Sequence, residues 1–226
     1  KTHPFLEQRE EKKVALVLLS SDTGLCGSYN NDLANTARTF LSERGRDTAL
    51  VGVGKFGITA LKRWGYSFQA AFTDLMASRI EEIIQNLKGT VEKIFLDRQA
   101  DAVYTVYSHF KTLTTYQPVT EKILPFQPQA LEGTEEPVEL DYIFEPSPEF
   151  IFERLIPLFF EAKVRTVFLE SIVSEQIARM TAMHQATENA KEMIDSLVLL
   201  RNKARQAAIT KEIIEIVSGS RALKIK

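Results

Sequence analysis

The sequence "VALVLLSSDTGLCGSYNNDL" (Val14–Leu33) combines an apolar run, a turn with two glycines and the start of an amphipathic segment. Six consecutive apolar residues followed by small and polar ones are typical of a buried strand and its turn. The stretch therefore predicts a strand, a turn and a helix in that order. In α/β proteins, the turn after a strand is the usual place for a ligand.

The same alternation continues along the chain to about Pro128. Further β-rich runs lie at Thr48–Val53, Tyr66–Phe72, Asp101–Phe110 and, interrupted by prolines, Thr114–Pro128. Amphipathic helical stretches separate them at Asn31–Arg44, Lys55–Trp64 and Ser78–Arg98. Strands that alternate with helices predict a Rossmann-like α/β domain with a largely parallel sheet over residues 14–128.

The character of the sequence changes after an acidic connector at residues 129–147. No glycine occurs between Gly133 and Gly219, and Pro157 is the last proline. Residues 148–226 are rich in helix formers and predict one long C-terminal helix. Sixty residues of it would reach roughly 90 Å. Such a helix needs a partner along its length.

Apolar residues recur in this segment at steps mostly compatible with three and four, and alanine is frequent among them. The positions are Val173, Ile177, Met180, Ala190, Ile194, Leu197, Ala204, Ala208 and Ile213. Small residues on such a seam allow close helix packing, as in a coiled coil. The alternative is the core face of a helical bundle, but no other segment of the sequence is long enough to cover it.

The amino-acid composition is typical of an ordinary soluble protein. The 226 residues are 44% hydrophobic and 26% charged, with a formal net charge of -2. This balance offers no reason to expect nucleic acid as a partner. No apolar run approaches the roughly 18–20 residues that a membrane-spanning helix needs. The first 13 residues form a polar leader and read as a chain entered part-way through.

The loop "GVGKFG" (Gly52–Gly57) matches the dinucleotide-binding pattern G-x-G-x-x-G. It follows a predicted strand, opens a predicted helix, and has Asp74 about 20 residues further on. These features make an NAD(P)-dependent oxidoreductase the alternative function. Against it, the loop belongs to the second strand–helix unit, and no later segment offers a substrate domain. A tight turn that requires glycine for steric reasons is the competing interpretation.

Cys26 is the only cysteine, so no internal disulfide can form. A nucleophilic role would need a base, and among His3, His109 and His184 only His109 is placed plausibly. The turn lacks the Gly-Lys-Ser/Thr ending of a P-loop, and no Cys/His cluster has metal-ligand spacing. We therefore expect no catalytic residues, no cofactor and no metal, and instead a structural or coupling role.

Two segments are similar to the gamma subunit of the rotary F-type ATP synthases. "SSDTGLCGSYNNDL" (Ser20–Leu33) resembles that family's S/T-D-x-G-L-C-G-x-x-N signature. "SEQIARMTAMHQATENAKEMIDSLVLLRNKARQAAITKEIIEIVSGSRAL" (Ser174–Leu223) resembles its long C-terminal signature without a gap. With the α/β middle, the resemblance covers nearly the whole chain. Family members begin with a helix that pairs antiparallel with the C-terminal one. This sequence starts after that helix, which explains a helix without a partner.

The resemblance implies a non-catalytic rotor shaft in a proton-transporting ATP synthase. Its partners would be the alpha and beta subunits of the catalytic ring, an epsilon-type subunit and the membrane c-ring. The fold would join the α/β domain to one helix of an antiparallel coiled coil. The subunit would be peripheral on the inner side of an energy-transducing membrane, with the cytoplasmic face of a bacterial inner membrane favoured over an organelle. A generic self-associating coiled-coil scaffold is a third interpretation.

The resemblance also implies two groups of functional residues. Arg205, Gln206, Thr210 and Glu212 match family positions that contact loops of the beta subunits. The turn of Asp22, Gly24, Leu25, Cys26 and Gly27 matches a structural joint beside the shaft. Plant chloroplast relatives carry a cysteine pair for redox control. Because Cys26 stands alone and the connector is short, thiol regulation is not expected.

Overall fold

The structure is a computed structural model that describes residues 3–45, 48–112, 115–127, 145 and 147–223. By its internal contacts the chain divides into two compact units, Lys1–Thr181 and Ala182–Lys226. All strands belong to the first unit. The predicted connector, 129–147, lies outside the described residues except for Glu145 and Ser147. The division into leader, α/β domain, connector and helix stays a prediction.

A five-stranded sheet forms the centre of the first unit. Its strands are β1 (Val14–Leu19), β2 (Ala49–Val53), β3 (Ala70–Phe72), β4 (Ala102–Thr112) and β5 (Thr115–Leu124). The spatial order is β3-β2-β1-β4-β5, and every pair is parallel except β4 with β5. This confirms the predicted mixed α/β fold with a largely parallel sheet.

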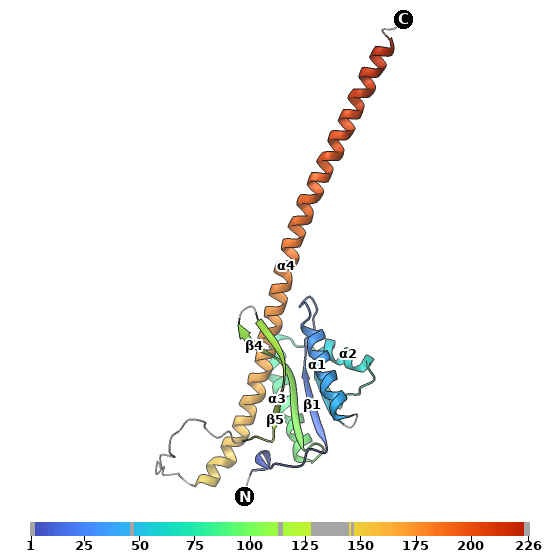
Figure 1. Cartoon of the computed structure of the whole chain (residues 1–226). Helices are drawn as coiled ribbons and strands as arrows, with labels where there is room; N and C mark the ends of the chain where they lie inside the picture. The colour runs from blue at the N-terminus through green and yellow to red at the C-terminus, as the bar shows by residue number, and fades with distance from the viewer. Residues whose placement is uncertain (1–2, 46–47, 113–114, 128–144, 146, 224–226) are drawn as a thin grey trace, which may run out of the picture. The chain divides into compact units, whose positions relative to one another are not determined.

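Helices cover both faces of this sheet (Figure 1). On one face lie α1 (Tyr29–Arg44) and α2 (Lys55–Arg63), which share a core with Leu16 and Leu18 of β1. On the other face lie α3 (Ile80–Leu96) and the first part of α4 (Pro148–Leu223), which share a core with Val17. All six residues of β1 are buried, as expected for a central strand covered on both faces.

The two edge strands differ from the central ones. β3 has only three residues, although Tyr66–Phe72 was predicted as one strand. Tyr66 instead continues the turn after α2, where its amide donates to the carbonyl of Leu61 at 3.1 Å. At the opposite edge, β5 contains Pro118. Proline removes a backbone donor from a ladder, so an edge is where a strand tolerates it.

The beginning of the chain packs onto the sheet layers. A short 3-10 helix at Pro4–Leu6 buries the ring of Phe5 against Phe95 and Phe160, with ring centroids 6.1 and 5.0 Å away. The guanidinium of Arg9 lies 4.6 Å from the centre of the Phe95 ring. The described part of the polar leader thus contributes an aromatic anchor to the core.

The long C-terminal helix is present as predicted. α4 extends from Pro148 to Leu223, 76 residues, and includes Pro157 without interruption. A short 3-10 turn at Ala77–Arg79 precedes α3. None of the helices in the described ranges is both long enough and apolar enough to cross a membrane.

Two ion pairs join α3 to the first part of α4. Arg165 donates two hydrogen bonds of 2.6 Å to the two carboxylate oxygens of Glu81, and Lys88 donates one of 2.6 Å to Glu161. The hydrogen bonds from Arg165 lower the pKa of Glu81 to about 2, and the bond from Lys88 lowers the pKa of Glu161. Because Glu81 is more than half exposed, solvent screens most of this interaction.

Glu81 gives a pH-dependent prediction. A carboxyl with a depressed folded-state pKa contributes stability above its ordinary pKa, and this contribution is lost as the pH falls toward the folded-state value. We therefore expect Glu81→Gln to reduce the acid-induced loss of stability between pH 4.5 and about 2. Urea denaturation of the wild-type and Glu81→Gln proteins across this pH range measures the change in the free energy of unfolding. Parallel stability curves for the two proteins would contradict the assignment.

Candidate functional site

The turn between β1 and α1 contains the predicted residues Asp22 to Gly27, and Asp22 is its centre. One carboxylate oxygen of Asp22 accepts from the backbone amide of Lys55 at 2.8 Å, and the other accepts from the amide of Leu75 at 2.8 Å. Lys55 begins α2, and Leu75 follows β3. A single side chain therefore ties together three loops at the carboxyl edge of the parallel strands.

The first backbone amides of α2 have no acceptor inside the helix, and each donates instead to another part of the chain. Besides Lys55, the amide of Phe56 donates to the carbonyl of Ser21 at 3.1 Å, and the amide of Gly57 donates to Oγ of Ser20 at 3.0 Å. The first amides of a helix are the groups that bind a phosphate in dinucleotide-binding proteins. Here, the end of β1 and its turn take that position.

The three glycines of "GVGKFG" are required by close packing. A Cβ on Gly54 would lie 2.1 Å from the carbonyl oxygen of Ser20, and one on Gly57 would lie 2.6 Å from its Oγ. On Gly52, a Cβ would lie 2.5 Å from Ile58. Gly54 also has a φ of 88°. The pattern thus reflects the close approach of α2 to β2 and of the end of β1 to the start of α2, which favours the steric interpretation over the nucleotide-binding one.

Asp74, the acidic residue of the fingerprint, is bound to a side chain of the same loop region. Nζ of Lys55 lies 2.9 Å from its carboxylate, and Arg79 lies at 3.9 Å. The hydrogen bond with Lys55 lowers the pKa of Asp74 and raises that of Lys55. The ribose-binding role of the alternative function therefore finds no support.

The turn has an uncommon backbone. Leu25 has a φ of 63° and a side chain that is 75% exposed, and Gly27 has a φ of 60°. A non-glycine residue in this region costs roughly 1–2 kcal/mol. Such a conformation persists when neighbouring contacts determine it. Here they include the hydroxyl of Ser21, which donates to the carbonyl of Thr23 at 2.7 Å.

Cys26 fills the space under this turn. It is 2% exposed, and its Sγ accepts from the side-chain Nδ2 of Asn30 at 3.2 Å. The carbonyl of Thr23 is a second polar neighbour at 3.9 Å. His109, the one base considered for it, lies instead against Glu170, with 3.0 Å from Nδ1 to the carboxylate. Within the described residues, Cys26 thus has the surroundings of a small core residue.

Residues on α4 that the sequence analysis did not single out bind this region. Ser171 is bonded to Tyr29, Ser174 to β4, and Arg179 to the turn itself. The available signal was that "SIVSEQIAR" (Ser171–Arg179) places polar residues on the apolar stripe of α4. Polar residues on a core-facing stripe indicate specific partners.

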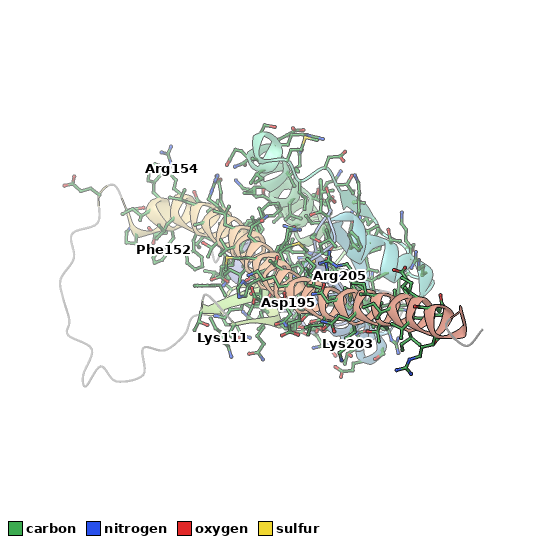
Figure 2. All side chains as sticks on the ribbon, turned by 90° about the horizontal axis from the view of Figure 1, so that it is seen from above. Lys111, Phe152, Arg154, Asp195, Lys203 and Arg205 are labelled. Atoms are coloured by element: carbon green, nitrogen blue, oxygen red, sulfur yellow. The ribbon has the colours of Figure 1, made fainter. Side chains whose placement is uncertain are left out.

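The second unit carries the other predicted site. Arg205, Gln206, Thr210 and Glu212 are all exposed on α4. None of the four makes a side-chain hydrogen bond or an ion pair with another residue that the structure describes. Gln206 and Thr210 share a face at i, i+4. Arg205 leaves the helix on a different side from Lys203 (Figure 2).

Many large apolar side chains are exposed in the same unit. Examples are Met193, Ile194, Leu197, Leu199, Leu200, Ile213, Ile214 and Ile216, each more than half exposed. Among the predicted seam residues, Ile177 is buried in the first unit, whereas Met180, Ile194, Leu197 and Ile213 are exposed. Apolar residues gathered on an exposed helix mark a surface for a protein partner.

Comparison with known proteins decides the family. A family model described as ATP synthase matches residues 1–223. The chain is 41% identical over 226 residues to the ATP synthase gamma chain of Moorella thermoacetica and 39% identical over 223 residues to that of Pelotomaculum thermopropionicum. Each match covers 99% of this chain and 78% of the relative. The chain belongs to the ATP synthase gamma chain family. As a gamma chain, it is a subunit of an enzyme complex and part of its central stalk.

Solved structures share the fold of this gamma chain. One is from the mitochondrial ATP synthase of Euglena gracilis, described as OSCP/F1/c-ring, with a TM-score of 0.65 and 18% identity over 94% of this chain and 73% of that one. Another is from the central stalk and c-ring of the mitochondrial ATP synthase of Tetrahymena thermophila, with a TM-score of 0.60 and 21% identity. This match covers 80% of this chain and 79% of that one.

Gly54 of the gamma chain allows a matched test of the packing between β1 and α2. We expect Gly54→Ala to lower the free energy of unfolding by about 3 kcal/mol or more, because it adds a clash to a strained φ. The control is Gly89→Ala in α3, where an added Cβ meets nothing within 4 Å. That change should stabilise the protein by about 1 kcal/mol. Chemical denaturation measures both, and equal stability of the two variants would contradict the packing described.

Asp22 of the gamma chain gives a second prediction. Asp22→Ala removes the acceptor of two backbone amides, so we expect a loss of about 2 kcal/mol in the free energy of unfolding. Asp22→Asn keeps one acceptor oxygen and should lose less. Asp97→Ala, at the end of α3, serves as a control with little effect. Thermal or urea denaturation separates these, and an unchanged Asp22→Ala protein would refute the role of Asp22.

Proposed function

We propose that this chain is the non-catalytic rotor shaft that couples ion flow through a membrane sector to ATP synthesis or hydrolysis at a ring of alpha and beta subunits. The observation that carries the proposal is α4 in the second unit. It is one continuous helix whose apolar and polar side chains are both exposed. In a protein of the gamma chain family, such a surface suits a helix enclosed by other subunits.

Rotation of this helix would act on the catalytic sites through unequal contacts. A ligand or partner shifts a conformational equilibrium only when it interacts differently with the two states. The sides of α4 differ in the required way: Leu197 and Ala204 share one side and supply apolar surface, whereas Arg205 and Glu212 lie on an adjoining stripe and supply charge. Turning the helix would therefore change which surface each surrounding subunit meets.

The remaining partners follow from the same proposal. The α/β domain would form the foot that binds an epsilon-type subunit and the c-ring, and the coupling ion would be a proton or sodium. The subunit would be peripheral on the inner side of an energy-transducing membrane, with a bacterial inner membrane favoured. A non-catalytic role agrees with the surroundings of Cys26, which is buried and bonded to Asn30.

Arg205, Gln206, Thr210 and Glu212 are proposed to contact the loops of the beta subunits. Arginine offers a fixed fork of donors for carboxylates, and glutamine and threonine offer neutral hydrogen bonds. Because no described residue of this chain occupies these groups, they are available to a partner. Such contacts can form with one beta subunit and break as the shaft turns.

A mutational test compares two sides of the same helix. We expect Arg205→Ala and Gln206→Ala to lower coupled ATP synthesis and hydrolysis in the reconstituted complex severalfold, with the melting temperature of the isolated subunit unchanged. Arg205→Lys should recover only part of the activity, because an ammonium lacks the planar fork. The control is Lys203→Ala, which removes a charge on a different side.

Normal turnover in the single mutants and in the double mutant would show that this face is merely solvated. Co-purification of the chain with alpha, beta and epsilon-type subunits tests the assignment itself. A generic scaffold would instead self-associate, and an oxidoreductase would change its fluorescence or melting temperature with a reduced nicotinamide cofactor.

A further inference from the structure

The contacts of α4 with the α/β domain change in character along the helix. From Ile156 to Phe168, its buried residues are apolar and belong to the core shared with α3. Ala178 belongs to the other core, beside Cys26 and Tyr29. Between Phe168 and Ile177, the buried residues are polar: Ser171, Ser174 and Glu175 are 5%, 0% and 8% exposed.

The first of these polar contacts joins α4 to α1. The hydroxyl of Tyr29, itself 1% exposed, lies 2.9 Å from Oγ of Ser171 and also 2.9 Å from its carbonyl oxygen. Burial raises the pKa of Tyr29, so its hydroxyl keeps its proton and can donate to the carbonyl. A tyrosine on α1 is thereby fixed to the backbone of one turn of α4.

The second and third contacts reach different elements. Oγ of Ser174 donates to the carbonyl of Ser108 in β4 at 2.9 Å. One turn further, Arg179 donates to Oγ of Thr23 at 2.6 Å and to the carbonyl of Gly24 at 3.4 Å. The carboxylate of Glu175 pairs with the same guanidinium and holds it in place.

These contacts restrict α4 in a way that apolar packing does not. An apolar interface can accommodate a small rotation or shift by changing rotamers, whereas hydrogen bonds weaken steeply when their angles change. Leaving a buried polar group without its partner is also costly. The three contacts come from α1, β4 and the turn after β1, so a rotation of α4 about its axis would disturb all of them.

The other polar contacts of α4 are more exposed than those of Tyr29 and Ser174, and they include the bond from Arg179 to the exposed Thr23. The Arg165 and Glu81 side chains are 39% and 59% exposed, and His109 beside Glu170 is 43% exposed. Water can replace partners at such sites, so these pairs resist displacement less. The buried contacts of Tyr29 and Ser174 are therefore where the helix is fixed most firmly, and the part-exposed Arg179 adds a contact with the turn.

We propose that Tyr29, Ser174 and Arg179 are positioning residues through which torque passes between α4 and the α/β domain. We call them the polar clamp. This inference rests on the proposed rotor function and adds where, within the subunit, the rotation of the helix is fixed to the domain. The clamp acts through α4 and contacts no reacting group.

The test measures twisting in the assembled complex. The catalytic ring is immobilised, and a probe is attached to the α/β domain through a cysteine introduced at exposed Arg98. During pauses of ATP-driven rotation, the angular variance of the probe reports how far the domain twists against the held helix. The variants are Tyr29→Phe, Ser174→Ala and Arg179→Met, singly and combined. The control is Tyr104→Phe, whose hydroxyl donates to Glu11 and not to α4.

We expect a severalfold larger angular variance in the combined variant, intermediate values in the single variants, and the wild-type value in the control. Unloaded ATP hydrolysis should stay near the wild-type rate, because a looser clamp leaves the catalytic ring unchanged. A purely structural role would instead lower the yield of assembled complex without changing the variance of the complexes that form.

Wild-type variance in all single variants, or in the combined variant, would overturn the clamp. The single variants keep the test decisive if the combined protein does not assemble. Failure of the proposed function has a different signature: the probe on the wild-type chain would not rotate with ATP at all.

Discussion

The need to satisfy the first backbone amides of α2 underlies much of the arrangement at the carboxyl edge of the sheet. Ser20, Ser21 and Asp22 supply one acceptor each, and all three lie directly after β1. Their approach brings β1 so close to α2 that only glycine fits at Gly54 and Gly57. The place where a related fold would bind a phosphate is thereby filled by the protein itself.

The same constraint determines how the turn meets α4. Because Asp22 is anchored to two neighbouring loops, the residues after it turn sharply through the left-handed conformations of Leu25 and Gly27. This geometry directs Thr23 and the carbonyl of Gly24 toward Arg179. A sequence motif that resembles a ligand loop thus serves as a joint between a sheet and a helix.

The sequence allowed prediction of most elements because their periodicity is strong. Hydrophobic periodicity indicates the type of element at β1, at β2 and in the three amphipathic helices. The absence of glycine from most of α4 indicates a long helix there. The length of β3 was overestimated because Tyr66 has a high strand propensity but lies in a turn. The glycines of "GVGKFG" fit both a nucleotide-binding loop and a tight turn, because a bound phosphate and a packed serine both require a residue without a side chain at these positions.

The candidate site was less accessible to sequence reasoning. Ser171 and Ser174 were not singled out in the sequence, and only the folded domain shows that their partners come from α1 and β4. Long-range pairing of this kind has no local signal. Arg205 and Gln206 were identified by resemblance alone, since a helix surface carries no sign of which side chains a partner will meet.

The edges of the sheet have a consequence for assembly. An exposed strand can pair with a strand from another molecule, which is a route to aggregation. Here, β3 offers a ladder of only three residues, and Pro118 removes a donor from β5. Backbone pairing across either edge is therefore short or interrupted. The surfaces of this unit are accordingly better suited to recognition by side chains, and newly made copies of the chain have little basis for joining sheet to sheet before they meet their partners.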